Sequence, residues 1–177
     1  MRRSELRENP DTERVITAEI NVSAPLADVW HAWTTKEGAE RFFAPRCNID
    51  LKPGGAYEML FDREAERGKQ GGEGMFVMAV QPQRMLAFTW NAPPHLPSVR
   101  GQMTHVMVRL TETDAGHTRV TLRHDGWGEG SDWDAAFQYF SNAWADIVLP
   151  RLRHRFLSGP VEWSNPPTFG RSRDGAA

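Results

Sequence analysis

Few residues of this sequence carry side chains suited to acid–base, nucleophilic or metal chemistry. Six histidines stand at positions 31, 95, 105, 117, 124 and 154, and the single cysteine is Cys47. No histidines pair four residues apart, as a helical zinc site requires, so we expect no bound metal. The sequence has no glycine-rich phosphate loop and no G-x-S-x-G or C-x-x-C motif. Arg46 beside Cys47 favours a thiolate, but a lone cysteine at a strand start is more typical of an inert residue.

His124 and Tyr57 are the two candidates for a catalytic role. His124 ends a row of alternating apolar residues and precedes the tripeptide Asp-Gly-Trp at 125–127. A histidine that faces a pocket exchanges a proton near neutral pH, and Tyr57 would be its helper. In the other interpretation, His124 is only hydrogen-bonded at the end of its strand.

Aromatic residues are the unusual part of the composition, with 7 Trp and 9 Phe against 2 Tyr in 177 residues. Tryptophans in a small domain fill a core, line a pocket or form an interface. The formal net charge of −2 gives no basic excess for phosphates, so we expect no nucleic-acid partner. The lone cysteine, and the lack of a long apolar run, favour a cytoplasmic protein without a membrane span.

The spacing of apolar residues predicts an α+β domain. Residues 14–22 alternate as a strand, and two helices are expected between residues 23 and 43. Six more strands are expected at 47–51, 56–61, 74–80, 84–90, 104–113 and 118–124. A long helix is expected over residues 131–157, with a kink in the turn before Pro150.

Composition divides the chain into three parts. Residues 1–13 are charged and poor in apolar residues, which is typical of a mobile leader. Residues 14–158 contain the expected elements and form the domain. Residues 159–177 are a Pro- and Gly-rich basic tail, in which Trp163 and Phe169 indicate some docking on the domain.

Five stretches, taken in order, carry a family resemblance. They are VSAPLADVWHAWTTKEGAERFF, KPGGAYEM, GEGMFVMAVQPQRMLAFTW, GHTRVTLRHDGW and NAWADIVLPRL. With these stretches the chain resembles the SRPBCC superfamily of START-like and Bet v 1-like proteins. Within it, the chain looks most like the family of homologues of the activator of Hsp90 ATPase. That family is functionally diverse, so the resemblance defines a fold more than a reaction.

The resemblance implies a helix-grip fold, in which a curved antiparallel sheet of about seven strands encloses a cavity with the long helix. Strand alternation and helical spacing nominate the residues that face this cavity. They are Tyr57, Met59, Phe76, Met78, Phe88, Trp90, Val106, Val108, His124, Phe137, Phe140 and Trp144. Trp90, Phe140 and Trp144 are the foremost candidates for pocket walls, while the others also fit plain core packing.

The expected function is binding of a small hydrophobic or aromatic molecule in this cavity, with no cofactor. Two alternatives stay open. One is an enzyme of the cyclase, aromatase or hydrolase type that uses the same cavity, and the other is an Hsp90 co-chaperone-like protein-binding module. Relatives often dimerise, so a homodimer is a further expectation, with Trp127, Trp133 and Trp163 as candidates for a lid or an interface.

Overall fold

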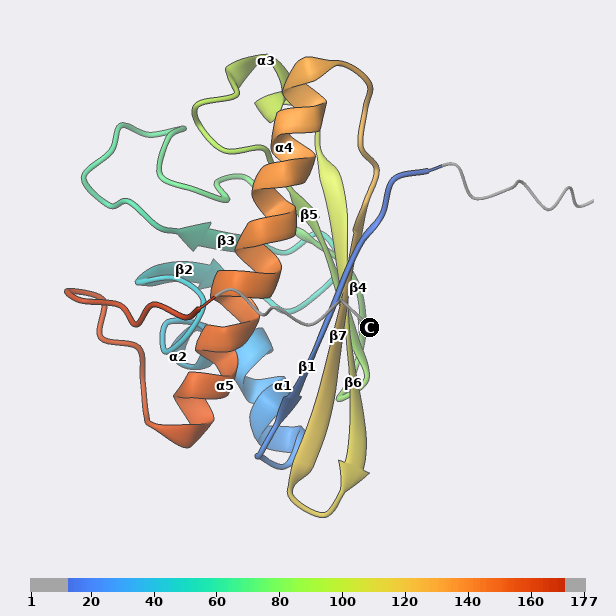
Figure 1. The fold of residues 1–177 in the computed structure, drawn as a ribbon, viewed down its shortest axis with the longest axis vertical. Coiled ribbons are helices and arrows are strands. Elements are labelled where there is room, and N and C mark those ends of the chain that lie inside the picture. Colours follow the sequence, from blue (N-terminus) through green and yellow to red (C-terminus); the bar gives the residue numbers. More distant parts are fainter. Residues whose placement is uncertain (1–12, 171–177) are drawn as a thin grey trace, which may run out of the picture.

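A five-stranded antiparallel sheet forms one side of the molecule, whose computed structural model describes residues 13–170. The strand order is β1 (Ile16–Val22), β7 (His117–Asp125), β6 (Thr104–Asp114), β5 (Met85–Trp90) and β4 (Val77–Gln81). Val106 pairs with His124 on one neighbour and with Phe88 on the other, so these three side chains share one face. Figure 1 shows the long helix crossing that side of the sheet.

A short hairpin, β2 (Arg46–Ile49) and β3 (Tyr57–Leu60), continues the sheet beyond β4. The amide of Tyr57 donates to the carbonyl of Met75 at 2.8 Å, and that of Gly72 donates to Met59 at 2.8 Å. The hairpin is thus tied to the segment that leads into β4. The expected helix-grip fold is confirmed, as a five-stranded sheet with an attached hairpin and a long C-terminal helix.

Two short helices after the first strand, α1 (Leu26–Thr34) and α2 (Lys36–Ala39), brace the end of the sheet. Their link is fixed by Thr35, whose hydroxyl accepts the amide of Gly38 at 3.0 Å and caps α2. The rings of Phe42 and Phe43 pack edge-on against Trp33, with centroids 5.0 and 5.5 Å away. These aromatic residues fill the space that the helices close.

The long helix consists of α4 (Ser131–Asn142), a π-helical turn (Ala143–Val148) and α5 (Leu149–Leu157). The amide of Leu149 donates to the carbonyl of Trp144, one residue further back than in an α-helix. Pro150 has no amide hydrogen and its ring crowds the preceding turn, which accounts for an irregularity at this place. The sequence predicts a kink in the turn before Pro150, and the structure has a π-helical turn at this place.

The face predicted for the fourth strand is wrong. Phe76 and Met78 are 38% and 43% exposed, whereas Met75 and Val77 are buried. All four are apolar, so alternation does not distinguish the two faces here. Backbone pairing decides instead, because Val77 bonds to Gly55 on the hairpin side and the register shifts after Val77 on the β5 side.

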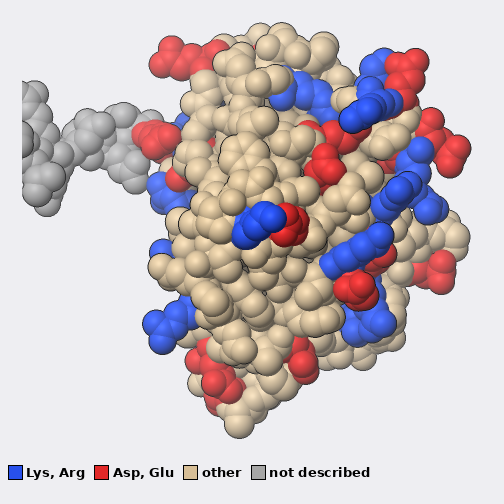
Figure 2. Space-filling model, turned by 180° about the vertical axis from the view of Figure 1, so that it is seen from behind, with Lys and Arg blue, Asp and Glu red and all other residues tan. Residues whose placement is uncertain are grey.

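The segment 159–170 lies against the body of the domain. The amide of Val161 donates to the carbonyl of Arg41 at 2.9 Å, and the indole of Trp163 donates to Glu40 at 2.6 Å. The predicted leader, apart from Glu13, and residues 171–177 of the predicted tail lie outside the described residues. Within residues 13–170, every helix is too short or too polar to cross a lipid bilayer. On the face in Figure 2, charges of both signs occur in small groups, mostly along one side.

Candidate functional site

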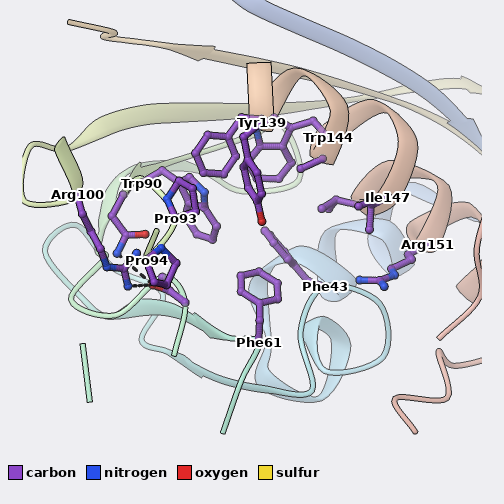
Figure 3. A pocket seen from close by; sticks show the side chains of 16 residues that line it. Phe43, Phe61, Trp90, Pro93, Pro94, Arg100, Tyr139, Trp144, Ile147 and Arg151 are labelled. Atoms are coloured by element: carbon purple, nitrogen blue, oxygen red, sulfur yellow. Dashed lines mark hydrogen bonds between the residues drawn. The ribbon is translucent and has the colours of Figure 1, made fainter. Parts of the chain in front are cut away.

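A pocket of about 240 Å³ opens between the long helix and the loops that follow β3 and β5. A cavity of roughly 150 Å³ is enough to hold benzene. The pocket therefore has the size of a small aromatic molecule with one or two rings. Figure 3 shows aromatic rings and prolines around most of it, with one arginine at each end.

Two adjacent rows of the long helix form one wall. The first row has i, i+4 spacing and consists of Tyr139, Ala143, Ile147 and Arg151, and the second consists of Phe140, Trp144 and Val148. The second row is buried and belongs to the core, while Tyr139 and Ile147 in the first are 46% and 42% exposed. Four of these residues belong to the π-helical turn, which places the irregular part of the helix directly at the pocket.

The opposite wall requires two glycines that lie close to aromatic rings. A Cβ at Gly72 would stand 3.0 Å from the indole of Trp90, and one at Gly71 would meet the carbonyl oxygen of Met59 at 2.4 Å. Gly71 also has a positive φ of 144°, which other residues rarely adopt. These glycines let the loop lie flat against Trp90 and Phe61.

Arg100 joins the two loops of this wall. Its Nε donates to the carbonyl of Gly68 at 3.0 Å, one Nη donates to Gly71 at 2.6 Å, and the other donates to Ala92. A carboxylate oxygen of Glu73 lies 3.8 Å from the guanidinium. All three nitrogens of Arg100 are thus used in building the wall, which leaves little for a ligand.

The inner end of the pocket is a cluster of three aromatic residues in mutual contact. Ring centroids are 5.7 Å apart for Phe43 and Trp90, 5.8 Å for Phe43 and Trp144, and 5.8 Å for Trp90 and Trp144. Each comes from a different part of the fold: the turn after α2, the end of β5 and the π-helical turn. Their faces and edges offer a surface for another aromatic ring.

Arg151 is the second cation at the pocket. Its guanidinium carbon lies 5.3 Å from the ring centre of Trp163, and its buried Nε has no hydrogen-bond partner among the described residues. Burial lowers the pKa of Arg151, and no described carboxylate counteracts this effect. Figure 3 shows the side chain extending from α5 toward Phe43.

His124 is buried away from the pocket, and both of its ring nitrogens are engaged. Trp144 Nε1 donates to Nδ1 at 3.0 Å, so the proton of the neutral ring is on Nε2, which donates to the hydroxyl of Thr104 at 2.7 Å. That hydroxyl donates in turn to the carbonyl of Trp90 at 3.3 Å. Burial, with a smaller contribution from His105, lowers the pKa of His124 to about 3. The geometry fits the interpretation of a hydrogen-bonded core histidine.

Tyr57 and Cys47 are also in the interior. The hydroxyl of Tyr57 donates to the carbonyl of Trp33 at 2.8 Å, and burial raises the pKa of this phenol well above its usual value. Burial raises the pKa of Cys47 to about 12, so its sulfur stays a thiol at neutral pH. Neither residue lines the pocket, so the structure gives Tyr57 no contact with a ligand there.

Of the twelve residues predicted to face a cavity, the structure places three at the pocket: Trp90, Phe140 and Trp144. Met59, Phe88, Val106 and Val108 do point inward, but they are buried in a filled core. Phe137 packs beside Trp127, with ring centroids 5.3 Å apart. The space under the sheet is therefore occupied by side chains, and the pocket lies at its margin.

Other pocket residues were missed in the sequence. The helix row of Tyr139, Ala143, Ile147 and Arg151 lies one position before the apolar row that the spacing identified. A mixed row with i, i+4 spacing next to a core row was the available signal. Phe43, Phe61, Pro93, Pro94 and Arg100 come from turns and loops, for which no periodic pattern exists.

The tryptophans divide among core, pocket and edge. Trp33 is in the core, and Trp30 packs against it from the same bracing helix. Trp127 and Trp133, predicted at a lid or an interface, contact each other next to a small apolar cluster formed by Ala92, Val99 and Ala136. Trp133 is buried within the chain itself, so it is not available as an interface residue.

A helix-grip α+β fold with a pocket between sheet margin and long helix defines the structural class. Comparison with known families then identifies the chain: the sequence pattern of the Activator of Hsp90 ATPase homolog 1-like proteins matches residues 23–155. The chain belongs to this family. Comparison with curated protein sequences finds no match.

Solved structures that share this fold include the following three. The Aha1 dimer of Colwellia psychrerythraea has 20% identity and a TM-score of 0.63, covering 82% of this chain and 98% of that one. CalU16 of Micromonospora echinospora has 22% identity and a TM-score of 0.61, covering 88% and 82%. An HSP90 activator of Plasmodium falciparum has 14% identity and a TM-score of 0.61, covering 82% and 96%. At these identities the similarity concerns the fold.

Proposed function

We propose that this protein binds a small, largely apolar aromatic molecule in the pocket between the long helix and the two loops. The observation that carries the proposal is the composition of the lining. Aromatic, aliphatic, proline and glycine residues make up most of it, and its polar side chains are Asn91, Arg100, Arg151 and the hydroxyl of Tyr139. Apolar walls with a few polar groups are typical of ligand sites.

The same lining favours binding over the cyclase, aromatase or hydrolase alternative. Among the described residues, no His, Cys, Ser, Thr, Asp or Glu lines the pocket. Such groups are the usual general acids, general bases and nucleophiles, and Tyr139 is the one pocket residue among those described whose type can also take that role. The earlier candidates His124 and Tyr57 bond to other parts of the protein instead.

Calorimetric titration with the uncharged bicyclic probe 2-naphthamide tests the proposal. We expect saturable binding of one molecule per chain to the wild-type protein. Ala143→Phe adds a ring inside the pocket and should reduce the affinity at least tenfold, because the ring occupies the ligand's place.

Ala145→Phe is the matched control, because Ala145 lies in the same π-helical turn but is exposed and does not line the pocket. This variant should keep the affinity within twofold of wild type. An equal loss of affinity in both variants would overturn the proposal, as would failure of the folded wild-type protein to bind either this probe or its carboxylate analogue, 2-naphthoate.

A further inference from the structure

Arg151 offers the pocket an uncompensated positive charge. It stands at the end of the helix row that begins with Tyr139 and lines the pocket with its side chain. Its Nε is buried and donates to no acceptor among the described residues. A buried donor without a partner is costly, and the cost is larger for a charged group.

The other contacts of Arg151 do not neutralise it. Its guanidinium carbon lies over the ring of Trp163, which attracts the cation through the ring face but accepts no in-plane hydrogen bond. Arg100, the other pocket arginine, differs in this respect, because its three nitrogens donate to three backbone carbonyls and Glu73 lies nearby. The two arginines therefore have different roles. Arg100 holds the wall together, whereas the guanidinium of Arg151 makes no hydrogen bond to another described residue, and its Nη groups, unlike the enclosed Nε, are accessible to a ligand.

We propose that the natural ligand carries an anionic group, such as a carboxylate, that binds to Arg151 while its apolar part lies on Phe43, Trp90 and Trp144. This inference rests on the proposed binding function and names the chemical class of its ligand. The planar guanidinium matches a carboxylate through parallel N–H···O bonds, and such charge-assisted bonds are about twice as strong as neutral ones. Arg151 thus favours anionic ligands over neutral ones that would fit the aromatic cluster of the pocket equally well.

A pair of probes that differ in charge but hardly in shape tests the inference. We expect wild-type protein to bind 2-naphthoate at least tenfold more tightly than 2-naphthamide in calorimetric titrations at pH 7.5. Arg151→Gln should weaken naphthoate binding at least tenfold and leave naphthamide binding within twofold. Arg151→Lys, which keeps the charge but not the planar fork, should fall between the two.

Arg153→Gln is the control for nonspecific attraction, because Arg153 is exposed on the same helix and its loss changes the net charge equally. It should leave both affinities within twofold of wild type. Equal affinity of the wild type for the two probes would overturn the anion inference and leave the binding function intact. Failure of both probes to bind would overturn the binding function itself.

Discussion

At the scale of single residues, His124 shows how a reactive side chain can be wholly structural. One of its nitrogens accepts from Trp144 and the other donates to Thr104, so it joins β7 to the long helix and to β6. The same bonds hold Trp144 in place, and Trp144 is part of the pocket wall. His124 therefore acts on the pocket only through the position of that indole.

This environment predicts a pH-dependent stability. An unfolded histidine has a pKa near 6.5, and that of His124 in the fold is about 3. The unfolded chain therefore takes up a proton that the native state does not, and stability present above pH 6.5 is lost as the pH falls toward 3. The contribution has a limiting slope of about 1.4 kcal/mol per pH unit.

Urea unfolding between pH 7.5 and 4.5 measures this effect in wild type and His124→Gln. The variant should be less stable at pH 7.5 but should lose stability less steeply toward low pH, because glutamine does not titrate. Equal slopes in wild type and His124→Gln would show that His124 is not the titrating group.

At the scale of elements, the pocket depends on two loops and one irregular turn. The loops after β3 and β5 contain glycine and proline in place of periodic apolar residues, and Arg100 ties them together through backbone carbonyls. The π-helical turn supplies Ala143, Trp144, Ile147 and Val148 to the facing wall. The wall formed by the loops is therefore held by side-chain bonds to backbone carbonyls, whereas the sheet is held by ladders of backbone pairing.

Replacing Arg100 by lysine tests this role of the side chain. Lysine keeps the charge but cannot donate to three carbonyls in one plane, so we expect a loss of about 1–3 kcal/mol in unfolding free energy. Amide exchange in residues 62–72 should speed up more than in β6. Arg67→Lys, at an exposed position of the same loop, should change neither quantity. Unchanged exchange in Arg100→Lys would contradict the proposed function of this arginine.

At the scale of the whole molecule, the segment after α5 runs back to pack against the turn after α2. The indole of Trp163 donates to the carbonyl of Glu40 beyond α2 and lies against Arg151, so it connects the bracing helices with the pocket. The predicted docking of the tail thus has a consequence for the site. The position of Arg151 depends on Trp163, which is itself held in place by the carbonyl of Glu40.

Trp163→Ala should lower the unfolding free energy by about 1–2 kcal/mol, since it removes one hydrogen bond and one cation–π contact. It should also weaken the binding of 2-naphthoate more than that of 2-naphthamide, because Arg151 loses its support. Leu157→Ala, an exposed large-to-small change nearby, should stay within about 0.5 kcal/mol of wild type. If Trp163→Ala had the same unfolding free energy as wild type, the docked segment would contribute nothing to the stability of the fold.

The sequence by itself determined the order of the elements and the position of most core residues. The alternation of Val106, Val108 and Phe88 and the helical spacing of Phe140 and Trp144 each have a single solution that buries apolar side chains. The sequence pattern failed at Phe76 and Met78, where apolar residues stand on both faces and backbone pairing with the hairpin and with β5 chooses between them. The local pattern of apolar residues is sufficient to predict the buried face of a strand or helix where only one of its faces is apolar.

Only the tertiary structure decided where the pocket lies and what lines it. The cavity expected under the sheet is filled by strand residues such as Met59 and Phe88. Aromatic rings from the bracing helices and the turn after them belong to the same core cluster. The open space is at the margin, where loops without periodicity meet a mixed row of the long helix. Whether Arg151 has a partner depends on contacts between distant segments, and no local spacing of residues encodes those contacts.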